Sequence, residues 1–243
     1  MLKECIRKFK VTTFDIDFCR RTTPKSILGY MEETATEHAI DLGFSYEESH
    51  KSGFFWVLRS AKFEFKKLPM INDEIQVKTY FAGFSGLKTL RKFEFKLNND
   101  IIGYGYNHWL MISDAEKKPY IDLGFTKKVN SIYPKGVNPF KLNRIRFNEE
   151  MIFSYQKKIM PNDIDMNYHV NNVKYAEFIF NAIPINILEQ NDIISLHIDY
   201  LIECKLDDLV DIYYKVIDNK ILIEGKKENA VMFKSLIEIK KKK

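Results

Sequence analysis

The chain repeats one order of structural elements twice, and this repeat limits the folds that its 243 residues can adopt. Asp15-Ile16-Asp17 matches Asp163-Ile164-Asp165, 148 residues further on, without a gap. In each copy an extended stretch (6–14 and 153–160) precedes the triplet, a helical pattern follows it, and strand-like segments come next. This order predicts the α+β class, with two domains that each wrap an antiparallel sheet around one helix.

Both predicted helices have recognisable ends. Thr23 is a suitable N-cap for the first helix, and Gly43 is a suitable stop. Asn171 or Asn172 caps the second helix, and Pro184 ends it. The second helix is apolar nearly all round, which is typical of a buried helix.

Strands are predicted where apolar and polar residues alternate or where apolar residues run together. The first half offers 54–66, 74–82, 88–97 and 101–112, and the second half offers 193–204, 209–217, 220–226 and 231–239. Residues 114–148 are rich in Lys, Asn, Pro and Gly and resemble a surface connection. We therefore expect an N-terminal domain at 1–125, a linker at 126–148 and a C-terminal domain at 149–243.

Composition excludes several kinds of protein. The 19 Phe and 13 Tyr indicate a large apolar interior with room for an apolar ligand. The formal charge of +5 is spread over short lysine pairs, so a solvated surface is the default and attraction to an acidic partner is the alternative. Without a basic arm or a nucleic-acid motif, nucleic-acid binding is disfavoured.

Neither a metal site nor a cofactor site is predicted. Cys5, Cys19 and Cys204 are too few and too scattered for a disulfide framework or a zinc site, and the histidines lack ligand spacing. No dinucleotide or phosphate loop occurs. No apolar run approaches the roughly 20 residues that span a bilayer, and the first residues lack an apolar signal core. We therefore expect a soluble, cytoplasmic protein.

The densest group of reactive side chains precedes the second helix. Asp165, Asn167 and His169 occupy alternate positions there. Backbone N–H groups at the start of a helix point outward and favour negative charge, as acyl-transfer chemistry requires. In the first copy Cys19 and Arg21 stand where Asn167 and His169 stand in the second.

These residues carry a family resemblance. Asp165-Met166-Asn167-Tyr168-His169-Val170-Asn171-Asn172-Val173-Lys174-Tyr175 resembles the catalytic loop of acyl-acyl-carrier-protein thioesterases, the plant-type enzymes and their bacterial relatives. Glu203-Cys204 resembles the second catalytic segment of that family, and Trp109-Leu110-Met111-Ile112 resembles the end of its first domain. The resemblance implies two tandem hotdog domains, catalysis by the second domain and acyl-chain binding by the first.

The resemblance also implies the site residues: Asp165, Asn167, His169 and Glu203. Histidine titrates near neutrality and suits a general base, whereas Glu203 is the rival base or orients the water or His169. Asp165 is expected to hold the network in register, and backbone N–H groups at 171–173 to stabilise an oxyanion. Glu203 falls in a predicted apolar strand, where a carboxylate needs a partner. Cys204 is expected to be a small buried residue, with direct nucleophilic attack as the alternative.

The same resemblance implies the reaction and its partners. The chain would hydrolyse fatty acyl-acyl carrier protein, ending chain elongation in fatty acid biosynthesis, with no cofactor beyond the phosphopantetheine of the substrate. Acyl carrier protein is acidic and would be attracted by the positive charge. A monomer or a homodimer fits the tandem repeat. The candidate acyl-binding residues are Ile27, Met31, Thr34, Ala35, Phe55 or Trp56, and, beside the catalytic loop, Asn171 and Asn172.

Three other functions stay open. An acyl-CoA thioesterase of the same fold would release the same fatty acid from another carrier. A hotdog dehydratase would also use a histidine and a carboxylate but would release no thiol. A non-catalytic acyl-binding protein would need neither Asp165, Asn167, His169 nor Glu203, so their presence argues against it.

Overall fold

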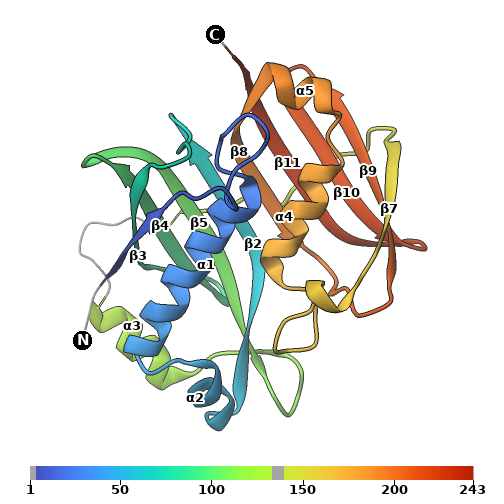
Figure 1. Cartoon of the computed structure of the whole chain (residues 1–243). Helices are drawn as coiled ribbons and strands as arrows, with labels where there is room; N and C mark the ends of the chain where they lie inside the picture. The colour runs from blue at the N-terminus through green and yellow to red at the C-terminus, as the bar shows by residue number, and fades with distance from the viewer. Residues whose placement is uncertain (1–3, 133–139, 243) are drawn as a thin grey trace.

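The computed structural model describes residues 4–132 and 140–242 (Figure 1). Its first half contains β1 (Cys5–Lys10), α1 (Pro24–Asp41), α2 (Tyr46–Lys51), β2 (Phe54–Phe65), β3 (Glu74–Ser85), β4 (Lys88–Leu97), β5 (Asp100–Ser113), β6 (Pro119–Tyr120) and α3 (Leu123–Ile132). Its second half contains β7 (Ile152–Lys158), the short 3-10 turn η1 (Pro161–Asp163), α4 (Asn172–Asn181), α5 (Ile185–Gln190), β8 (Asn191–Tyr200), β9 (Leu209–Ile217), β10 (Lys220–Lys227) and β11 (Ala230–Lys241).

Within the described residues, one antiparallel sheet of 11 strands runs through both halves. Its order is β1-β3-β4-β5-β2-β8-β11-β10-β9-β7, with the short β6 beside β5. The halves join where β2 pairs with β8, from Ser60 opposite Asp199 to Glu64 opposite Ser195. Figure 1 shows α1 and α4 side by side against this sheet. The twofold order predicted from sequence is therefore confirmed.

The core lies between the two helices and the sheet. Leu196 and Ile198 on β8 face the helices and are fully buried, as is Phe63 on β2. Side chains alternate along a strand, so the residues between them face away from the helices. Gly105 on β5 allows α1 to approach closely, because a Cβ there would lie 2.8 Å from Cε of Met31.

The repeat extends to single hydrogen bonds in the loops before α1 and α4. Asp17 N–H donates to the carbonyl of Arg21 at 2.8 Å, and Asp165 N–H donates to the carbonyl of His169 at 2.9 Å. Each aspartate carboxylate also accepts the N–H two positions later, at 2.8 Å in both loops. The residue three positions after each aspartate has a positive φ, 65° in one loop and 61° in the other. The two loops therefore share one backbone conformation.

The two loops carry different chemistry on that shared backbone. Arg21 is buried and pairs with Asp17 at 2.6 Å. It also reaches the second domain, where it pairs with Asp192 at 2.9 Å and donates to the carbonyl of Asn191 at 2.5 Å. The loop of the first domain thus braces the two domains against each other.

Most predicted element ends match the structure. Thr23 caps α1 by accepting the N–H of Ser26, and Asn171 caps α4 by accepting the N–H of Val173. The predicted strand at 193–204 was wrong at its end, because β8 stops at Tyr200.

Helices α2, α3 and α5 were not predicted. Two of them have only six residues, too few to show a helical period, and α3 crosses the expected domain boundary at residue 125. Phe125 anchors α3 in an aromatic cluster with Trp56 and Phe81. Residues 133–139 of the expected linker lie outside the described residues. No helix in the described part of the chain is long and apolar enough to span a bilayer.

We predict that Arg21→Ala lowers the free energy of unfolding by about 3 kcal/mol or more, because it leaves the Asp17 carboxylate buried without its partner. Urea unfolding followed by circular dichroism measures the change. Arg7→Ala is the matched control, since Arg7 pairs with Glu33 at the surface and should cost less than about 1 kcal/mol. Equal losses in the two variants would contradict the bracing role of Arg21.

Candidate active site

A cleft of about 550 Å³ opens between the second-domain loop and the first domain. Residues 165–170 and 200–203 line it on one side. The first-domain side is lined by Tyr46, His50, Phe55, Trp56, Val57, Leu58, Arg59, Asp114 and Lys117. A cleft of this size suits a small organic substrate.

Asp165 shapes the loop on the second-domain side. Its carboxylate accepts the N–H of Asn167 at 2.8 Å, and its own carbonyl accepts the N–H of Tyr168 at 3.1 Å. Tyr168 has φ of 61°, a conformation that costs a non-glycine residue of the order of 1 kcal/mol. The tight turn presents Asn167 and His169 to the cleft.

His169 and Glu203 form the reactive pair of the cleft. Nε2 of His169 lies 3.2 Å from Oε2 of Glu203. The side chains are 34% and 49% exposed, so both water and a substrate can reach them. The backbone fixes this pairing, since the N–H of Val170 donates to the carbonyl of Cys204 at 3.1 Å. The structure therefore brings together the two residues predicted to compete as the base.

The surroundings predicted for Glu203 were wrong. The residue does not lie in a buried strand, because β8 ends three residues earlier and Glu203 stands in the following loop. Its partner is the imidazole of His169 at the cleft, not a group in the core. This position leaves the carboxylate free to act on substrate or water.

Asn167 is exposed at the rim, and its Nδ2 lies 3.5 Å from Oδ2 of Asp165. Asn171 turns away from the reactive pair, since its Oδ1 caps α4 and its Nδ2 donates to Oε1 of Glu32 at 3.3 Å. Burial raises the pKa of that Glu32 carboxyl. Asn172 lines the cleft itself.

The predicted oxyanion donors are only partly available. The N–H of Asn171 donates to the carbonyl of Asp163 at 2.9 Å, and the N–H of Val173 donates to Oδ1 of Asn171 at 2.8 Å. Among the described residues, only the N–H of Asn172 within this group of three has no acceptor in the protein. The helix start therefore offers one backbone donor rather than three.

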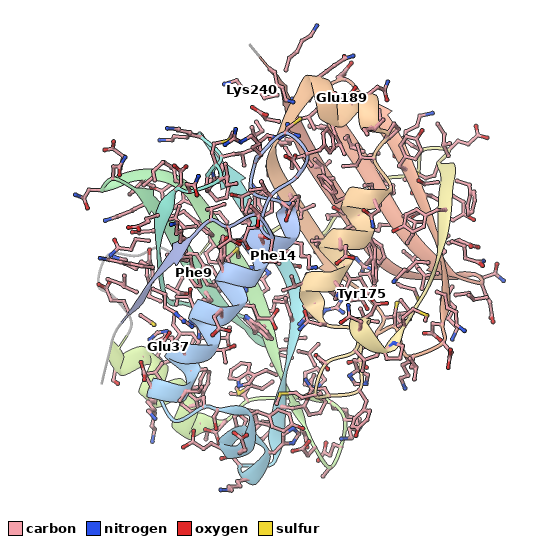
Figure 2. The ribbon with its side chains drawn as sticks, viewed as in Figure 1. Phe9, Phe14, Glu37, Tyr175, Glu189 and Lys240 are labelled. Atoms are coloured by element: carbon pink, nitrogen blue, oxygen red, sulfur yellow. The ribbon has the colours of Figure 1, made fainter. Side chains whose placement is uncertain are left out.

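Cys204 is buried beneath the cleft. Only 1% of the residue is exposed, and its backbone N–H donates to the hydroxyl of Tyr175 at 3.1 Å. Tyr175 comes from α4, as labelled in Figure 2. Burial raises the pKa of the Cys204 thiol to about 11, so little thiolate exists at neutral pH. The geometry agrees with the expectation of a small buried residue.

Some of the predicted acyl-binding residues lie at the cleft or beside it. Phe55 and Trp56 line the cleft. Met31 lines a cavity of about 10 Å³ below it, and Leu58, Asn172 and Tyr200 line both spaces.

Three other candidates lie away from the cleft. Thr34 and Ala35 are buried in the first-domain core and do not line the cleft. Ile27 packs near Arg21, also away from it.

The first-domain side of the cleft was missed from sequence. His50 on α2 pairs through Nδ1 with Oδ2 of Asp114 at 3.0 Å, and both residues line the cleft. A local signal existed, because Ser45 and Glu48 form a capping box that starts α2. No sequence pattern near this helix, however, indicates that it lies opposite His169. Among the described residues, no three His, Cys, Asp or Glu side chains gather as metal ligands would.

Two family models cover most of the chain. Residues 3–121 match the model described as the acyl-ACP thioesterase N-terminal domain, and residues 148–243 match the acyl-ACP thioesterase C-terminal domain. Among curated proteins, oleoyl-acyl carrier protein thioesterase 2 of Arabidopsis thaliana is 26% identical over 227 residues, which cover 84% of this chain. The palmitoyl-acyl carrier protein thioesterase of Gossypium hirsutum is 23% identical over 247 residues and covers 93% of it. The chain spans 60% and 56% of the lengths of these two relatives.

Solved structures share the whole architecture. An acyl-ACP thioesterase from Bacteroides thetaiotaomicron superposes with a TM-score of 0.89 at 25% identity, covering 98% of each chain. The 12:0-ACP thioesterase from Umbellularia californica superposes with a TM-score of 0.88 at 20% identity, covering 100% of this chain and 99% of that one. At that identity the second match supports the fold alone. The architecture is the tandem hotdog fold.

We predict that iodoacetamide labels Cys204 of the folded protein at least about a hundredfold more slowly than the half-buried Cys19 near pH 8. A thiol pKa raised from 9.0 to about 11 lowers the thiolate fraction about a hundredfold, and burial blocks access further. Peptide mass spectrometry measures both rates. In urea-unfolded protein the two thiols should react alike. Equal rates in the folded protein would show that Cys204 is an accessible thiolate after all.

Proposed function

Since the chain belongs to the acyl-ACP thioesterase family, we propose that it hydrolyses the thioester of fatty acyl-acyl carrier protein and so ends chain elongation in fatty acid biosynthesis. The observation that carries this proposal is the 3.2 Å pair of His169 and Glu203 in a cleft lined by both domains. The C-terminal domain, 149–243, supplies the chemistry. The N-terminal domain, 1–125, holds the acyl chain, and 126–148 links the two.

The pair supplies a base for water. A water molecule beside His169 and Glu203 attacks the thioester carbonyl carbon, and its proton passes to the imidazole–carboxylate pair. When the carbon–sulfur bond breaks, the pair returns the proton to the leaving thiolate. The products are a fatty acid and the carrier thiol. Glu203, 3.2 Å from Nε2 of His169, holds the imidazole in position for the proton transfer.

The oxyanion that forms on the carbonyl needs donors already in place. The N–H of Asn172 lies at the start of α4, where the helix dipole favours negative charge. The side-chain amide of Asn167 is the second donor, held near the loop by Asp165. Asp165 thus acts by positioning, and Cys204 takes no part.

The acyl chain enters through the wall that the cleft shares with the small cavity. Leu58 and Tyr200 line both spaces, and Met31 lies on the far side. Thr34 and Ala35 follow Met31 by one helical turn on the buried face of α1, so they would meet the end of a longer chain. Phe55 and Trp56 contact the part of the substrate nearest the thioester.

Acyl carrier protein is the proposed partner. Arg59 and Lys117 lie at the cleft and the chain carries a net positive charge, which attracts an acidic carrier.

The substrate brings its own phosphopantetheine, and the reaction needs no other cofactor. We place the reaction in the cytoplasm. The tandem repeat supplies within one chain the pairing that single hotdog domains obtain by dimerising, so a monomer is sufficient and a homodimer is compatible.

We predict that matched acyl-acyl carrier protein and acyl-CoA substrates are turned over at different rates, with the carrier protein preferred at least about tenfold in kcat/KM because of charge attraction. A thiol reagent reports product release from both. A preference for CoA would identify an acyl-CoA thioesterase and reject the carrier. Enoyl product without release of thiol would identify a dehydratase. Absence of product from both substrates would identify a non-catalytic acyl-binding protein.

We predict that His169→Ala and Glu203→Gln each lower kcat by about a hundredfold or more while the protein stays folded, because each removes one half of the base. Thiol release measures kcat, and circular dichroism monitors folding. Glu150→Gln, at an exposed glutamate away from the cleft, is the matched control and should keep full activity. Near-normal turnover in a folded His169→Ala or Glu203→Gln variant would refute the assignment of that residue.

A further inference from the structure

A second cavity, of about 570 Å³, lies on the face of the sheet that points away from the helices. Ser195 and His197 on β8 form part of its floor, since Leu196 and Ile198 between and beyond them face the core. Segment 141–149 forms the roof. Among the residues that the structure describes, none lines both this cavity and the active-site cleft.

Hydrogen bonds hold the roof over the floor. Asp199, the next outward-facing residue on β8, accepts the N–H of Ile145 in the roof at 2.7 Å. The same carboxylate accepts the hydroxyl of Ser60 on β2 at 2.5 Å. These bonds and the nearby histidine keep the pKa of the Asp199 carboxyl below its usual range in spite of burial. The cavity is therefore built by the fold.

The lining carries an excess of positive charge. Its cationic side chains are those of Lys62, Lys141, Arg144, Arg146 and Lys220. Among the described residues, its carboxylates are those of Glu149 and Glu238. Lys62 pairs with Glu64 at 2.7 Å. The other four cations have no ion pair with any residue that the structure describes. Such a concave cationic lining attracts anions.

A buried histidine lies in the floor of the cavity. His197 is 8% exposed, and its Nε2 makes no hydrogen bond to the described residues. The nearest carboxylate oxygen, Oδ1 of Asp199, is 3.4 Å away and already accepts the hydroxyl of Ser60. His197 and Asp199 therefore form a buried pair beneath the floor, and the groups that can meet an anion are the cations of the lining.

We propose that this cavity binds a phosphate-bearing small molecule of about nucleotide size. Arginine side chains such as Arg144 and Arg146 suit phosphate oxygens, because the guanidinium donates two parallel hydrogen bonds. Apolar side chains, among them Phe147, Leu222 and Leu236, offer contact to the body of such a ligand. The volume falls in the range of small-molecule sites.

Isothermal titration of the full chain with ADP and with inorganic pyrophosphate tests the proposal. We expect binding of at least one of them with a Kd below about 1 mM, and none of uncharged adenosine. Tighter binding of ADP would identify a nucleotide-like ligand. Equal binding of pyrophosphate would identify the phosphate group alone as the ligand. Absence of binding by both would overturn the proposal.

Variants assign the binding to this cavity. The double variant Arg144→Glu with Arg146→Glu should weaken binding at least about tenfold. The double variant Lys66→Glu with Lys67→Glu makes the same charge change at exposed lysines elsewhere and should bind normally. His169→Ala should also bind normally, because it alters only the cleft.

If the double arginine variant fails to fold, the single variant Lys220→Glu is measured in its place. Undiminished binding in a folded variant of the cationic lining would place the ligand elsewhere and overturn the proposal.

Discussion

The backbone ladder between β2 and β8 is the constraint on which the rest of the structure depends. It joins two half-sheets into one and sets α1 and α4 side by side against the same face. The first-domain wall of the cleft is thereby fixed opposite the second-domain loop. Both the cleft and the outer cavity use residues from strands on each side of this joint.

Function in this fold rests on side chains placed on a backbone that is the same in both copies. The loops before α1 and α4 share their turns, their aspartate hydrogen bonds and their positive φ. One loop presents Arg21, which is buried and binds the other domain, and the other presents His169, which stays accessible beside Glu203. A loop conformation alone therefore does not make a site.

Much of this could be predicted from the sequence, because the signals are local. Caps at Thr23 and Asn171 and the alternation along the strands depend only on neighbouring residues. The end of β8 could not be predicted, since the apolar run continues past Tyr200 and tertiary pairing with β11 decides where the strand stops. The positions of His50 and Asp114 opposite the loop before α4 likewise follow from how distant segments meet.

The fusion of the two copies has a genetic consequence. In a symmetric dimer of single-domain chains, one codon specifies the same residue at both sites, so a change that builds a brace at one site destroys the catalyst at the other. Here Arg21 and His169 are encoded separately on equivalent backbones. A mutation in one copy therefore leaves the other copy unchanged. Arg21 can join the two domains in the first copy while the second copy keeps the imidazole of His169.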